Sequence, residues 1–375
     1  MSNASGRETY EELGVRPVIN ATGENRTLLG GSILSTKVSR AMQAANRYYV
    51  DMKELLDRTG EIIAELLGCE AAQVTPGCCA ALALGTAACM AGDDPGMIER
   101  LPDVKGMRDE VIIQKGLRNK YDRCVTVSGA TLVEVGEESG TSPDQIEAAI
   151  GDKTAAIHYL APGGREGVVP LEQVIAVGRR HQVPIIVDAA GQVYPVENLS
   201  KYTAMGADLV GYGAKYFGGP NSTGILCGRK DLVEAAALHG FIGFESTVHR
   251  SFGRPMKLDR QEIIAVVVAL REWLTMDHQA RFLTYGRRVA NLQRGLERVA
   301  GIQVVPEGSP VTGLLVRVDE KALGRTVAET AEALREGDPS IWVRLREDAI
   351  TLSVKTIVDG DERVIADRLK RLLSG

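Results

Sequence analysis

The chain has 375 residues, of which 44% are hydrophobic and 25% are charged, and its formal net charge is −5. This composition is typical of a globular protein with a large core and about two domains. The sequence contains no run of about eighteen apolar residues, which excludes a membrane-spanning helix. The negative net charge argues against a nucleic-acid partner, which needs a basic face.

The N-terminal segment and the cysteines indicate the compartment. The first six residues are polar or small, and they predict neither a signal peptide nor a transit peptide. No cysteine belongs to a CxxC pair and histidines are scarce nearby, so we expect no metal site. Reduced thiols in a cytoplasmic protein are the simplest interpretation. The cysteines are Cys69, Cys78, Cys79, Cys89, Cys124 and Cys227.

Strand and helix patterns alternate through the first part of the chain. Helical periodicity extends over 38–67, where Gly68 supplies a stop, and residues 93–107 form the least ordered insert. Further helices are expected over 78–91, 143–150 and 171–181, and strands over 71–75, 110–114, 130–135, 155–159 and 184–187. This order predicts a mostly parallel sheet with helices on both faces.

The pattern changes after Asp259. Residues 260–299 are nearly all helix-forming, with apolar residues at helical spacing. Short strands are then expected over 303–305, 314–318, 341–345 and 350–354, and helices over 326–335 and 361–373. We therefore expect an N-terminal arm over 1–45 that packs on a small domain, a large domain over 46–255, and a long linking helix with the small α/β domain over 256–375.

Two residues of the expected sheet suggest a cofactor. Asp188 directly follows the buried strand, and Lys215 lies in the glycine-rich segment after another apolar stretch. Ligands of open parallel sheets gather at the carboxyl ends of the strands. A lysine amine and a carboxylate at this edge suit pyridoxal 5'-phosphate (PLP), because the amine forms a Schiff base and the carboxylate keeps the pyridine nitrogen protonated. Taken singly, Asp188 is better explained as a helix cap and Lys215 as a surface lysine, and only their combination with the glycine-rich segment favours the cofactor.

A phosphate site is expected where a strand ends at Thr75 and a helix of small residues begins after Pro76. The free N–H groups of Gly77, Cys78 and Cys79 would be the donors. A simple turn between strand and helix is the competing interpretation. We expect both thiols to be buried at this helix start, which argues against a role as sulfur carriers. Two further cofactor contacts are expected from His158 over the ring and from Gln192 at the phenolic oxygen, although a hydrogen-bonded core histidine is an equally good interpretation of His158.

Substrate contacts are expected from cationic residues. Arg344 and Arg346 lie on one face of a small-domain strand, and an arginine there can bind a substrate carboxylate through two hydrogen bonds. Lys355 follows the next strand, and Arg118 follows a strand of the large domain. A solvated strand face is an equally good interpretation for either arginine of the pair.

Several segments resemble the selenocysteine synthase family, which comprises L-seryl-tRNA selenium transferase and its relatives. Residues 18–23 (VINATG) resemble the N-terminal motif of that family. Segments 29–35, 52–55, 187–190 and 254–259 look closer to its D-glucosaminate-6-phosphate ammonia-lyase branch. The resemblance extends over nearly the whole chain, from about residue 10 to residue 373.

The resemblance implies an α/β protein of PLP-dependent transferase fold type I, which is the aspartate-aminotransferase type. It implies a homodimer or higher oligomer with shared active sites, and it matches Lys215 to the Schiff-base lysine, Asp188 to the pyridine-binding carboxylate and Arg344 to a C-terminal arginine. One departure is Tyr212-Gly213-Ala214-Lys215 in place of Ser-Gly-x-Lys, so a serine that helps hold the phosphate is missing. The tRNA-gripping domain of the selenium transferases is not expected, which disfavours a tRNA substrate.

The expected function is a PLP-dependent lyase that acts on an amino acid or amino-sugar acid. Lys215 would remove the α-proton, a β-hydroxyl or similar group would leave, and the resulting enamine would hydrolyse to a 2-keto acid and ammonia. An aldolase, a racemase or a sulfur or selenium transferase could use the same residues. A catalytically silent regulatory subunit is the alternative from another class, which the pairing of Asp188 with Lys215 argues against. A nicotinamide dehydrogenase is disfavoured because no GxGxxG fingerprint is present.

Overall fold

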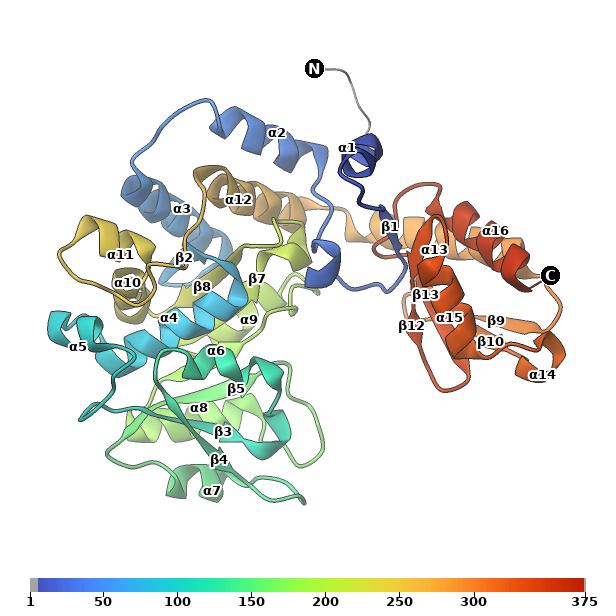
Figure 1. The fold of residues 1–375 in the computed structure, drawn as a ribbon. Coiled ribbons are helices and arrows are strands. Elements are labelled where there is room, and N and C mark those ends of the chain that lie inside the picture. The colour runs from blue at the N-terminus through green and yellow to red at the C-terminus, as the bar shows by residue number, and fades with distance from the viewer. Residues whose placement is uncertain (1–5, 374–375) are drawn as a thin grey trace. The chain divides into compact units, whose positions relative to one another are not determined.

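A computed structural model describes residues 6–373 and divides the chain into two compact units (Figure 1). The large unit consists of residues 32–275, and the small unit combines the residues up to Gly31 with those from Met276 onward. These bounds differ from the expected divisions at 45 and 255. The reason is that α2 (Thr36–Ala45) packs against α12 (Arg260–Thr275), which keeps both helices in the large unit.

The large unit is built on a seven-stranded sheet with the order β2-β8-β7-β6-β5-β3-β4. Its strands are β2 (Ala71–Thr75), β3 (Glu110–Gln114), β4 (Thr131–Val135), β5 (Thr154–Leu160), β6 (Ile185–Asp188), β7 (Leu209–Gly213) and β8 (Gly224–Gly228). β8 runs antiparallel to both of its neighbours, and every other neighbouring pair is parallel. The prediction of a mostly parallel sheet is confirmed.

Helices cover both faces of this sheet. They are α2, α3 (Met52–Leu67), α4 (Gly77–Ala91), α5 (Pro95–Arg100), α6 (Arg123–Thr126), α7 (Pro143–Ala148), α8 (Leu171–His181), α9 (Asn198–Met205), α10 (Lys230–His239), α11 (Phe241–Ser246) and α12. α4 is buried nearly all round, as its alanine- and leucine-rich sequence predicts. It packs on the face that carries Ile186, Leu209 and Leu226, whereas Val187 and Val210 face the opposite core.

Two expected helices are each interrupted by an N-capping aspartate. The stretch 38–67 contains both α2 and α3, because the Asp51 carboxylate accepts the backbone N–H groups of Lys53 and Glu54 and begins a new helix. The stretch 260–299 contains α12 and α13 (His278–Leu296), and the carboxylate of Asp277 caps the second helix. Gly68 ends α3 with a φ of 65°, as expected. The insert 93–107 contains the short helix α5.

The small unit holds a four-stranded antiparallel sheet with the order β12-β13-β10-β9 and a parallel pair, β1 with β11. Its strands are β1 (Val18–Asn20), β9 (Ile302–Glu307), β10 (Gly313–Val318), β11 (Ser340–Trp342), β12 (Arg344–Leu345) and β13 (Ala349–Ser353). Its helices are α1 (Gly6–Glu12), α13, α14 (Glu320–Leu323), α15 (Val327–Glu336) and α16 (Asp361–Leu373). The single strand expected over 341–345 is therefore two strands, which lie in different sheets.

We predict that Gly224→Ala destabilises the protein. A Cβ at this position would lie 2.5 Å from the carbonyl carbon of Gly77 and 2.6 Å from the oxygen of Tyr212, and backbone atoms have little freedom to move. Overpacking of this kind costs about 1–3 kcal/mol in free energy of unfolding. Gly151→Ala, where a Cβ meets nothing within 4 Å, is the control. Equal urea midpoints for Gly224→Ala and Gly151→Ala would contradict the close contact of Gly224 with the backbone of Gly77 and Tyr212.

Candidate active site

Four segments that are far apart in the sequence meet at one edge of the large sheet. In the parallel register, Leu160 of β5 lies beside Asp188 of β6, which lies beside Gly211 of β7. β2 also runs parallel to β7, because both strands are antiparallel to β8. The start of α4, directly after β2, therefore lies at the same edge as Asp188.

Lys215 follows β7 in a short 3₁₀ turn, Ala214–Phe217. The loop that carries it is closed at its base, where the N–H of Ala214 donates to the oxygen of Thr223 at 2.9 Å. Nζ of Lys215 lies 5.3 Å from the centre of the Tyr216 ring. Burial lowers the pKa of the Lys215 amine, and the nearby Cys79 opposes that shift. A lower pKa increases the share of neutral amine, which is the nucleophilic and basic form.

Asp188 is buried at the end of β6. Its Oδ1 accepts the N–H of Ala190 at 3.0 Å and lies 3.5 Å from Sγ of Cys78. Since side chains alternate along a strand, Asp188 shares the sheet face of Ile186, which packs against α4. Burial and the charge of Asp188 raise the pKa of the Cys78 thiol well above its usual value. Cys78 is therefore a neutral neighbour of the carboxylate.

The start of α4 offers backbone donors. Pro76 precedes the helix and, in the described chain, provides no side-chain cap for the first N–H groups. Gly77 has a φ of 83°, a conformation that favours glycine. Tyr212 does not replace the serine missing from the family motif, because its hydroxyl donates to the oxygen of Asn198 at 2.8 Å from the opposite face of β7.

Two buried polar atoms near this edge lack a hydrogen-bond partner among the residues that the structure describes. They are Nδ1 of His158 and Oδ1 of Asn221. His158 lies on β5, on the sheet face of Ala156 that α4 covers, and burial lowers its pKa and favours the neutral ring. Asn221 belongs to the loop after Lys215. Buried polar atoms are normally hydrogen-bonded, so this edge fits a polar ligand.

The chemistry of these donors fits PLP. The amine of Lys215 suits an aldehyde, the carboxylate of Asp188 suits a protonated ring nitrogen, and the helix start at Gly77 suits a phosphate. Gln192 lies four residues after Asp188, is half-buried, and donates its backbone N–H to the oxygen of Ala189 at 2.8 Å.

The two adjacent cysteines differ, and the expectation that both thiols are buried is wrong for Cys79. Cys78 is buried, whereas Cys79 is exposed and α4, which carries it, packs against α6, which carries Cys124. Interaction with the Cys124 thiol, together with the charge of Lys215, lowers the pKa of Cys79 to about 7. Cys124 was not identified as a site residue, because it follows Cys79 by 45 positions in the sequence and no motif links the two.

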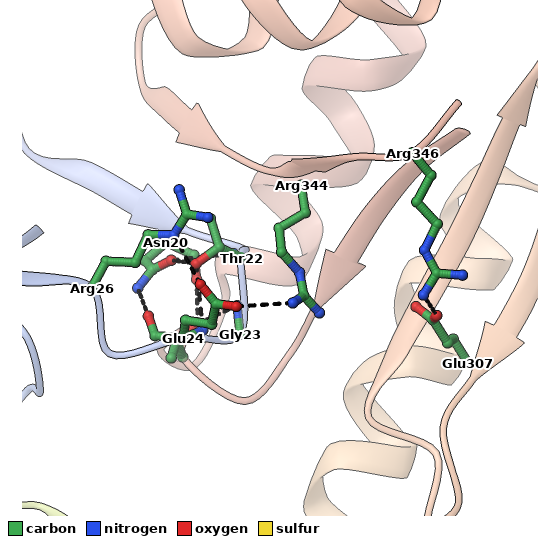
Figure 2. Close-up of polar contacts among 9 residues, drawn as sticks. Asn20, Thr22, Gly23, Glu24, Arg26, Glu307, Arg344 and Arg346 are labelled. Atoms are coloured by element: carbon green, nitrogen blue, oxygen red, sulfur yellow. Dashed lines mark hydrogen bonds and ion pairs between the residues drawn. The ribbon is translucent and has the colours of Figure 1, made fainter. Parts of the chain in front are cut away.

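The expected substrate residues fall in both units. In the large unit, Arg118 forms ion pairs with Asp122 and Glu134, each at 2.5 Å. In the small unit, Arg344 of β12 forms an ion pair with Glu24 at 3.0 Å, and Arg346 binds Glu307 (Figure 2).

Lys355 lies in the same small unit, two residues after β13. Burial of its amine and the charges of Arg344 and Arg281 lower its pKa, whereas the carboxylate of Glu24 raises it. Arg344 and Lys355 thus share Glu24 as a neighbour.

A cavity of about 650 Å³ lies at the other edge of the large sheet. It is lined by residues at the starts of β6 and β7 and at the end of β8, including Ile185, Asp208 and Gly228. These positions are at the amino ends of the parallel strands, opposite Lys215. The cavity therefore does not belong to the site described above.

We predict that Cys79 is the most reactive thiol. Its alkylation rate should rise with pH through about 7 and then level off, because the thiolate reacts and an ordinary thiol ionises near 8.5. Iodoacetamide labelling followed by peptide mass spectrometry measures the rate at each site. Cys124→Ser should shift the profile to higher pH, with Cys89→Ser as the control. Faster labelling of Cys124 than of Cys79 would refute the assignment.

Comparisons with known proteins point to one family. A family model described as L-seryl-tRNA selenium transferase matches residues 18–358. A 5'-C-glycyluridine monooxygenase-decarboxylase from a Streptomyces species is 36% identical, over 97% of this chain and 92% of that protein. The D-glucosaminate-6-phosphate ammonia lyase of Salmonella typhimurium is 29% identical, over 97% of both chains. The L-seryl-tRNA(Sec) selenium transferase of Moorella thermoacetica is 28% identical, over 98% and 84%.

Solved structures give the fold. A D-glucosaminate-6-phosphate ammonia-lyase superposes with a TM-score of 0.88 at 25% identity, over 100% of this chain and 99% of that one. A serine palmitoyltransferase from Sphingomonas wittichii has a TM-score of 0.56 at 15% identity, over 95% and 86%. An aspartate aminotransferase variant from Thermus thermophilus has a TM-score of 0.51 at 21% identity, over 99% and 97%. The predicted fold type I architecture is confirmed.

Proposed function

The chain belongs to the L-seryl-tRNA selenium transferase family, and from this membership we infer that it is a PLP-dependent lyase of the ammonia-lyase type. We propose that it acts on an amino acid or amino-sugar acid and releases ammonia and a 2-keto acid. The observation that carries this proposal is the meeting of Lys215, Asp188 and the start of α4 at one sheet edge.

The cofactor would be held by residues of the large unit. Lys215 would bond to its aldehyde carbon, Asp188 to its ring nitrogen, and the N–H groups of Gly77, Cys78 and Cys79 to its phosphate. We further propose His158 and Gln192 as contacts to the ring, and the unpartnered Nδ1 of His158 supports this role. When bound, PLP withdraws electrons from the α-carbon of an amino acid.

Lys215 is the proposed general base. Burial lowers the pKa of its amine, so more of the amine is neutral near pH 7 and can accept the α-proton at Nζ. Asp188, buried and hydrogen-bonded to the N–H of Ala190, would keep a negative charge fixed at the far end of the site. The base and the fixed charge are on adjacent strand ends, so neither needs a large movement to act.

We propose that Arg344 binds the acid group of the substrate, with Lys355 beside it. The lowered pKa of Lys355, caused by burial and by the charges of Arg344 and Arg281, supports an excess of positive charge there. Arg118 and Arg346 are further proposed contacts, although each already binds acidic side chains of its own unit.

We also propose a homodimer or higher homo-oligomer with shared active sites. Exposed apolar side chains support a subunit contact on the large unit, where Ile33, Tyr48 and Tyr49 are 75%, 72% and 96% exposed. No helix within residues 6–373 is long and apolar enough to cross a membrane. We propose a cytoplasmic location, which would suit the six cysteines, all of them without disulfide bonds.

A second candidate function is favoured by the relative that is 36% identical and is named 5'-C-glycyluridine monooxygenase-decarboxylase. By that reading the same residues would act on an amino acid carried by a nucleoside, with loss of carbon dioxide and use of oxygen. The lysine, carboxylate and helix start would serve both reactions equally.

We predict that Lys215→Ala abolishes the borohydride-reducible link between protein and cofactor. It should also lower the turnover rate by roughly 10²–10⁴-fold, which is the usual contribution of a general base to the rate. Absorbance spectra and mass spectrometry after borohydride reduction measure the link. Lys230→Ala, which alters an exposed ion pair with Glu234, is the control and should change neither quantity. A reducible link that survives in Lys215→Ala would refute the assignment.

A substrate screen separates the two candidate functions. We expect amino acids and amino-sugar acids to shift the cofactor spectrum and to release ammonia and 2-keto acid in equal amounts without oxygen. Ammonia and keto acid are measured by coupled assays in sealed, oxygen-free cuvettes. Turnover that requires oxygen and releases carbon dioxide would instead establish the monooxygenase-decarboxylase reaction.

A further inference from the structure

The turn after β1 is held rigidly in the small unit. Oδ1 of Asn20 accepts both the N–H and the hydroxyl of Thr22, at 3.1 and 2.7 Å, and its Nδ2 donates to the oxygen of Glu24 at 3.0 Å (Figure 2). The hydroxyl of Thr356 donates to the oxygen of Asn20 at 2.7 Å and accepts the N–H of Gly23 at 3.1 Å. These contacts fix the position from which Glu24 extends.

The same turn lies directly against the end of β13. Gly23 has a φ of 75°, and a Cβ there would lie 2.3 Å from Oγ of Ser353 and 3.2 Å from Cε of Lys355. This contact leaves room only for glycine. The turn therefore holds the backbone of Glu24 next to Lys355 and in reach of Arg344.

The carboxylate of Glu24 is surrounded by cations. Its Oε1 accepts from Arg344 at 3.0 Å, and its Oε2 accepts from Arg26 at 3.1 Å. Lys355 and Arg281 are also close enough to interact electrostatically in this cluster. Arg344 and Arg26 thus pair with the carboxylate, Lys355 lies near it, and Arg281 adds a further positive charge beside Lys355. Such an excess of positive charge suits an anionic ligand.

We propose that Glu24 is a specificity-determining residue that occupies Arg344 until the acid group of the substrate replaces it. This inference rests on the proposed function, in which Arg344 receives that acid group. The exchange replaces one carboxylate by another on the same guanidinium, so Arg344 stays paired, and Glu24 retains Arg26 as a partner. Ion pairs of half-exposed side chains contribute little net free energy, which makes the displacement of Glu24 accessible.

The arrangement gives selectivity against simple anions. With Glu24 in place, Arg344 and Arg26 are already paired, and a small inorganic anion must compete with a carboxylate held at the site by the rigid turn. A substrate that makes further contacts elsewhere has additional binding energy and can displace Glu24. Removal of the Glu24 charge opens the cluster to any anion of suitable size.

The test uses the full-length protein with bound cofactor and inorganic sulfate as the probe, measured by titration calorimetry. Glu24→Gln should bind sulfate on the order of tenfold more tightly than the unmodified protein, as for a site that is open about one tenth of the time. Asp348→Asn, which breaks the comparable exposed pair with Arg317, should leave sulfate binding unchanged. Arg344→Gln combined with Glu24→Gln should remove the gain.

Other results would overturn the inference. Equal sulfate binding by Glu24→Gln and the unmodified protein would show that Glu24 does not occupy the site. A gain in Glu307→Gln instead would assign the anion to Arg346. Sulfate binding requires no turnover, so its outcome is separate from that of Lys215→Ala. With an active substrate, Glu24→Gln should lower KM and increase inhibition by sulfate while kcat stays the same.

Discussion

The site depends on one close approach, between the start of α4 and the hairpin of β7 and β8. A Cβ at Gly224 would collide with the backbone of Gly77, and a Cβ at Gly211 would lie 3.1 Å from Sγ of Cys78. The absence of side chains at these glycines lets the helix begin directly over the sheet. The contact places the backbone of Gly77 directly against Gly224, which begins β8 and follows the loop that carries Lys215.

The strands of the large unit and the position of Asp188 at a strand end were largely predictable, because buried parallel strands are continuous apolar runs and their carboxyl ends share an edge. The helix breaks at Asp51 and Asp277 were not, since a capping aspartate inside a periodic stretch looks like a polar position on a helix face. The partnership of Cys79 with Cys124 also escaped prediction, because only tertiary packing brings α6 to α4.

The candidate residues lie in both units. The large unit carries Lys215, the buried Asp188 and the start of α4, all on the ends of regular elements. The small unit carries Arg344 and Lys355 together with the turn of Glu24, and this turn comes from the N-terminal segment of the chain. Glu24 and Arg26 therefore belong to the cationic cluster, although the whole large unit separates them from Arg344 in sequence.

The reversed strand β8 has a consequence for motion. Because the chain returns at once beside β7, the loop that carries Lys215 is anchored at both ends, and the hydrogen bond from Ala214 to Thr223 joins its two sides. The loop backbone is thereby restrained, and the amine can move mainly by rotation about its own side-chain bonds. Such rotations take picoseconds to nanoseconds, far less than an opening loop requires. Repositioning of Nζ therefore needs only side-chain rotation and no movement of the loop backbone.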